Sequence, residues 1–168
     1  MSYTGSGCSE LVAKGQPPSE DCLKKAAIDI SHDLQFLRLA WDHRTTRLGY
    51  TMWFVTARVI WDFFFVTKRK KLSKKETKFS DDVLASDYVD GWNNTAKALE
   101  AEAPVDSKTQ RDAANRLAAH LTYARADRRM TGGVAPSSEL HTFLIGVASV
   151  WLQQMKPERR VWFGGGVG

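Results

Sequence analysis

The stretch YTMWFVTARVIWDFFFV, from Tyr50 to Val66, decides which fold the rest of this chain can adopt. It is apolar on nearly every side of a helix, and such a helix lies either among other helices or inside a membrane. Its 17 residues fall at the lower end of the length that spans a bilayer. It also carries Arg58 and Asp62, and each charge would cost about 2.5–3.5 kcal/mol at a bilayer centre. We therefore expect the central helix of a soluble protein, with no membrane as a partner.

Arg58 and Asp62 form a polar seam on this otherwise apolar helix. Residues four apart lie on one helical face, so the two side chains can pair with each other. The seam is a first candidate for a functional site. The alternative is a structural salt bridge, because internal ion-pair networks also occur without function.

The length of 168 residues is enough for one domain with a sizeable core. We expect that domain at 19–160, between a flexible N-terminal lead at 1–18 and a flexible, glycine-rich tail at 161–168. The lead contains no apolar segment typical of a secretory signal, which predicts a cytoplasmic protein. Cys8 and Cys22 match no zinc spacing with the four histidines, and we expect reduced thiols, with a disulfide as the alternative.

The periodicity of the apolar residues predicts an all-α fold, a helical bundle of four long helices plus one or two short ones. Buried positions on the central helix should include Trp53, Ile60 and Phe64. No alternating strand pattern is present. The long helices are expected at Ser19–Arg44, Tyr50–Val66, Lys108–Arg129 and Ser138 to Pro157, and the short ones at 80–89 and Trp92–Ala103.

The net charge of +5 is concentrated in one segment, Lys68–Lys78, which holds seven basic residues and one glutamate. The remainder of the chain therefore sums to about −1. A basic run can neutralise phosphates without reading sequence, and the alternative is a solubilising loop. The candidate nucleic-acid-binding residues are Lys70, Lys71, Lys74, Lys75 and Arg125.

A second candidate site is the segment NRLAAHLT, Asn115 to Thr122. At about 100° per residue, Asp112, Arg116 and His120 fall on one strip of the expected helix. An arginine and a histidine on one strip can bind a phosphate and move a proton, since the histidine pKa lies near neutrality. The alternative is a histidine at the core boundary beside an ordinary surface pair.

This pattern of an asparagine, an arginine and a histidine on a late helix resembles the HEPN superfamily of helical bundles. Many of its members are metal-independent ribonucleases of toxin–antitoxin or antiviral defence systems. The family motif places slightly more residues between its arginine and histidine than separate Arg116 from His120. Asn115 occupies the position that would give the family spacing, so the motif here is degenerate.

The resemblance implies that the protein binds RNA or cleaves it without metal or cofactor, as a homodimer with a possible cognate partner protein. The implied catalytic residues are His120 as acid and base, Arg116 on the phosphate, with Arg111 or Arg125 as its substitutes, and Asn115 beside them. The alternative function is a non-enzymatic helical interaction or assembly module, such as a catalytically inert HEPN-like protein.

Overall fold

The structure, a computed structural model, describes residues 8, 12, 16–68, 82–119 and 134–167. Within these ranges the chain is all-helical and contains no strand, which confirms the predicted fold class. The α-helices are α2 (Glu20–Asp42), α3 (Arg47–Phe65), α4 (Trp92–Ala101), α5 (Ser107–Ala119), α6 (Ser138–Gln154) and α7 (Pro157–Arg160). Two 3-10 helices, η1 (Ala85–Asp87) and η4 (Val161–Val167), complete the described elements.

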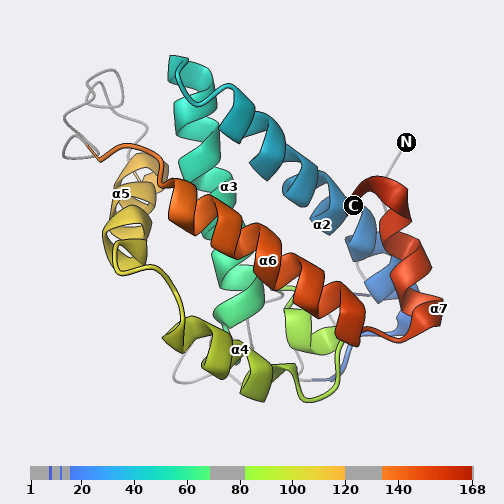
Figure 1. The fold of residues 1–168 in the computed structure, drawn as a ribbon. Helices are drawn as coiled ribbons and strands as arrows, with labels where there is room; N and C mark the ends of the chain where they lie inside the picture. Colours follow the sequence, from blue (N-terminus) through green and yellow to red (C-terminus); the bar gives the residue numbers. More distant parts are fainter. Residues whose placement is uncertain (1–7, 9–11, 13–15, 69–81, 120–133, 168) are drawn as a thin grey trace, which may run out of the picture.

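Helix α3 occupies the centre of the fold, as its composition predicts. Helices α2, α4, α5 and α6 and the 3-10 helix η1 all contact it. In Figure 1, α6 crosses in front of α3, with α2 on one side and α5 on the other. The side chains of Trp53, Ile60 and Phe64 are 0–1% exposed, so these predictions are confirmed. None of the helices in the described ranges is both long and apolar enough to cross a bilayer.

Side-chain caps fix where the long helices begin. The hydroxyl of Ser19 accepts from the backbone N–H of Cys22 at the start of α2, and Ser137 does the same for α6. Thr46 caps α3 and accepts from the N–H of Gly49. A Cβ at Gly49 would lie 2.1 Å from the carbonyl oxygen of His43, so the tight turn between α2 and α3 requires glycine. The predicted break between the first two helices is thereby confirmed.

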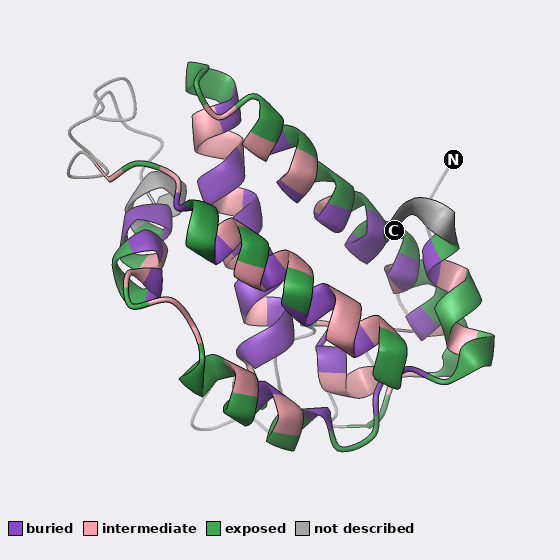
Figure 2. Cartoon of the chain, in the orientation of Figure 1, coloured by how far each residue is buried: buried purple, intermediate pink, exposed green. Residues whose placement is uncertain are grey.

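Aromatic side chains of α3 and α6 meet in the middle of the core. Figure 2 shows the buried faces of these helices turned toward one another. Two buried indoles are hydrogen-bonded as well as packed, which fixes their orientation. Trp92 donates to the carbonyl oxygen of Phe64 at 2.8 Å, and Trp151 donates to that of Ala85 at 3.1 Å. Segments far apart in the sequence are thus joined through hydrogen bonds from side chains to backbone carbonyl oxygens.

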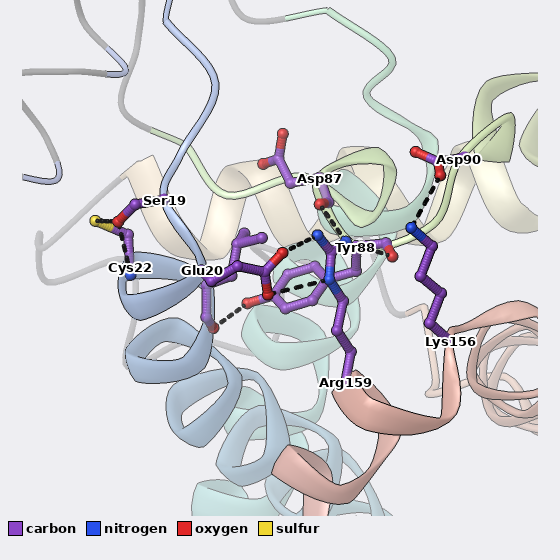
Figure 3. Close-up of polar contacts among 9 residues, drawn as sticks. Ser19, Glu20, Cys22, Asp87, Tyr88, Asp90, Lys156 and Arg159 are labelled. Atoms are coloured by element: carbon purple, nitrogen blue, oxygen red, sulfur yellow. Dashed lines mark hydrogen bonds and ion pairs between the residues drawn. The ribbon is translucent and has the colours of Figure 1, made fainter.

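A cluster of polar contacts around Arg159 ties the C-terminal region to α2 and η1 (Figure 3). The Arg159 guanidinium pairs with Glu20 and donates to the carbonyl oxygens of Asp87 at 3.2 Å and Tyr88 at 2.9 Å. The Tyr88 hydroxyl donates to the carbonyl oxygen of Leu23 at 2.8 Å. Burial raises the pKa of this hydroxyl, with Asp87 adding to the effect. The hydroxyl is therefore a neutral, structural donor.

The prediction of reduced thiols is wrong. Cys8 and Cys22 form a disulfide, and the side chain of Val12 between them is buried. The N-terminal lead is therefore attached to α2 at these positions. Disulfides are typical of oxidising compartments, so the cytoplasmic location remains a prediction.

The end of the chain also differs from its prediction as a flexible tail. Residues Val161–Val167 form η4, which contacts α2, and Phe163 is only 3% exposed. Pro157 does more than end the last long helix, because it opens α7, where a missing N–H costs nothing. The predicted helix from Lys108 is described as far as Ala119, where α5 ends.

Candidate functional site

The predicted pair in the polar seam is confirmed. Oδ2 of Asp62 lies 3.6 Å from Nε of Arg58, so the two side chains form an ion pair. A second cation joins them from α5, where Nη2 of Arg111 lies 3.8 Å from the other carboxylate oxygen of Asp62. The Arg111 guanidinium also lies 5.0 Å from the ring centroid of Trp61, a cation–π distance. The side chains of the three ionic residues are 39–42% exposed, so each pair contributes only about 0–1 kcal/mol.

The seam forms one wall of a cavity of about 680 Å³, which we call the α2–α3 groove. Its floor is the face of α3 that contains Val55, Val59 and Val66, and its other long wall is α2. Trp61 and Phe64, which pack against Phe143 and Trp151 of α6, do not line the groove, whereas Phe63 lines it and also contacts Trp151. The residues from Asp82 to Leu84 close one end of the groove. An apolar floor between charged walls is suited to binding.

Two carboxylates on the α2 wall, Asp29 and Asp33, face the groove one helical turn apart. Neither forms an ion pair with a basic residue in the described ranges. Burial raises the pKa of Asp33, the charge of Asp29 raises it further, and His32 opposes both. The sequence analysis missed this pair. The available signal was its spacing, because like charges four apart destabilise a helix.

The described residues of the HEPN-like motif on α5 are exposed, and they fall on two sides of the helix relative to the polar seam. Asp112 and Asn115 are exposed, whereas Gln110, Ala113 and Ala114 on the same helix are buried. At about 100° per residue, position 116 lies about 40° around the helix axis from Asp112 but about 140° from Arg111. Asn115 lies on the Arg111 side, about 40° from it. The structure therefore assigns Arg111 to the seam, with Asn115 on the same side of α5 and the backbone of residue 116 on the side of Asp112.

The remaining predicted site residues are only partly covered. The backbone of Arg116 belongs to α5, but its side chain lies outside the description. His120 and Arg125 lie outside the described residues, as do the four candidate lysines of the basic run: Lys70, Lys71, Lys74 and Lys75.

A different histidine has a defined environment. The ring of His141 stacks on Trp41 with centroids 4.6 Å apart and planes 8° from parallel. The Arg44 guanidinium also lies 4.1 Å from the centroid of the Trp41 ring. Burial lowers the pKa of His141, and Arg38 and Arg44 lower it further against the opposing charge of Asp42. His141 is thus a neutral packing residue at the core boundary.

Within the described ranges, no group of three or more histidine, cysteine, aspartate or glutamate side chains is arranged to hold a metal ion. No protein-family model, no curated protein and no solved structure matches this chain. The HEPN resemblance accordingly rests on the motif in the sequence and on the class of the fold.

Proposed function

We propose that the protein is a HEPN-like RNA-binding protein that contacts phosphates through Lys68–Lys78. The observation that carries this proposal is the segregation of charge. That segment has a net charge of +6, whereas the remainder of the chain is close to neutral. Binding by such a run depends on counterion release, so it is strongly salt-dependent and tolerant of sequence.

The motif edge of α5 supports the same proposal. Its described polar side chains face solvent, so this edge does not serve to pack the core. Residue 116 continues the exposed side of the helix on which Asp112 lies, by helical register of about 100° per residue.

The catalytic form of the proposal gives each motif residue a role. Arg116 holds the phosphate, and His120 removes the proton from the adjacent ribose hydroxyl. The oxygen attacks phosphorus, the bond to the next nucleotide breaks, and a proton is returned to the leaving oxygen. The products are a cyclic phosphate end and a free hydroxyl end. Asn115 contributes a polar contact, and two motifs from a homodimer would face each other, as the resemblance implies.

Binding is tested by fluorescence anisotropy with a labelled single-stranded RNA over a range of salt concentrations. Replacement of Lys70, Lys71, Lys74 and Lys75 by glutamine should weaken binding and reduce the salt slope by about three units. The matched control removes the same number of charges from described, exposed lysines: Lys24, Lys25, Lys97 and Lys108. Equal slopes for the two variants, or no binding by the wild type, would reject the proposed contact.

Cleavage is tested separately by incubation of the RNA with EDTA present, with cyclic phosphate ends as the readout. In the catalytic form, His120→Gln should keep the fold and lose about 10²–10⁴-fold in rate, the size of a general acid–base contribution. Wild type that binds RNA and leaves it uncut would identify an inert HEPN-like protein. Wild type that neither binds nor cuts would favour the helical interaction module.

A further inference from the structure

We propose that the α2–α3 groove is a docking site for the basic amphipathic helix of a partner protein. This surface is distinct from the RNA contact above, because the carboxylates of Asp29 and Asp33 would repel phosphates. The groove is lined by four aspartates and two arginines in a chain whose net charge is +5. It is therefore an acidic site on a basic protein, which favours a cationic partner.

The floor of the groove supplies the apolar part of the site. Val55 and Val59 line the groove, and Leu48 and Met52 precede them on the same face of α3, at steps of four, three and four. This is the spacing with which one helix packs along another. Leu48 is 70% exposed and Val59 44% exposed, although both lie on the central helix of the fold. Within the described residues, Leu48 and Val59 thus leave apolar surface of α3 open to a docked helix.

The α2 wall determines the charge of the partner. Asp29 and Asp33 are about 6 Å apart along the helix axis, the rise of one turn. Lysine or arginine residues one turn apart on a docked helix would match this separation. The opposite wall has a net charge of +1, because Arg58 and Arg111 share Asp62, and would repel the basic edge of a docked helix. A docked helix would therefore place its basic edge along α2 and its apolar face on the valines.

The length of the floor also suits a helix. From Val55 to Val66 the floor extends about 16 Å, or three helical turns. An amphipathic helix of that length places an anchor at each of its turns, as in other helix-in-groove complexes.

The test uses designed peptides as probes and the full chain as the receptor. One peptide is an amphipathic helix with leucine on its apolar face and lysine on its polar face, and the other has glutamate in place of lysine. Titration calorimetry at low salt should show binding of the lysine peptide only. Asp29→Asn/Asp33→Asn should weaken it at least about fivefold. Glu100→Gln/Glu102→Gln, which removes two exposed carboxylates from the C-terminal end of α4, should leave the affinity unchanged.

A charge-swapped receptor provides the second measurement. Asp29→Lys/Asp33→Lys should lose the lysine peptide and gain the glutamate peptide, with an unchanged far-ultraviolet spectrum. Equal binding of both peptides by the wild type would overturn the proposal. Displacement of the lysine peptide by spermidine would also overturn it, because it would indicate a small cation as the occupant. A dimer that Val59→Lys dissociates would overturn it as well, because it would indicate a second copy of this chain. None of these outcomes depends on whether the protein binds RNA.

Discussion

Truncation of Phe64 to alanine should destabilise the fold more than any surface change, because its ring lies at the junction of three elements. The side chain is 1% exposed, and its centroid is 5.7 Å from that of Trp151 and 5.9 Å from that of Trp92. Replacement of a buried phenylalanine by alanine lowers the free energy of unfolding by about 3–5 kcal/mol, including the contribution of the cavity left behind. A domain of ordinary stability has only about 5–15 kcal/mol in total.

For a chain of this size, each kcal/mol corresponds to about 2–4 °C in melting temperature. Phe64→Ala should therefore melt about 6–20 °C below the wild type by differential scanning calorimetry. Val105→Ala is the matched control, since this valine is fully exposed and its loss should change stability by no more than about 0.5 kcal/mol. A soluble Phe64→Ala protein that melts within about 3 °C of the wild type would refute the central position of α3.

Other substitutions test the contacts around the core. Arg159→Gln should cost about 1–3 kcal/mol, since it leaves two part-buried carbonyl oxygens without their donor and removes an ion pair with an exposed carboxylate, and an unchanged melting temperature would contradict this. Cys8→Ser/Cys22→Ser should cost about 3 kcal/mol, the loop entropy of a disulfide closing about 15 residues, and intact-mass spectrometry without reductant checks that the bond exists. Asp33→Asn should raise the melting temperature at neutral pH. The raised pKa of Asp33 means that the wild type loses stability as pH rises from the ordinary carboxyl pKa of about 3.9 through the raised value, so the gain should vanish near about pH 3, where the carboxyl is protonated in both the folded and the unfolded chain. A gain that persists at that pH would contradict burial and Asp29 as the causes of the raised pKa.

The local features of the fold were predictable because they depend on neighbours in sequence. Ser19 and Ser137 cap helices at the predicted positions, and the pair Arg58–Asp62 follows from helical spacing alone. The burial of Phe64 follows from a helix too apolar to face water on any side.

The features that could not be predicted depend on distant partners. Arg159 pairs with Glu20 across a separation of 139 residues, and no local pattern marks either as a contact. The glycine run after Phe163 indicates mobility, but burial of this ring beside Trp151 and Tyr88 overrides that local preference. The groove was missed for the same reason, since its walls belong to different helices.

The central claim, that RNA is bound through the basic run and the motif edge of α5, is tested most directly by photo-cross-linking. Single-stranded RNA containing thiouridine is irradiated with the wild-type protein, and the cross-linked peptides are identified by mass spectrometry. The account predicts cross-links within Lys68–Lys78 and around Arg116, with none on Asp29 or Asp33 of the α2 wall. Cross-links confined to the α2–α3 groove, or no cross-links at low salt, would contradict it.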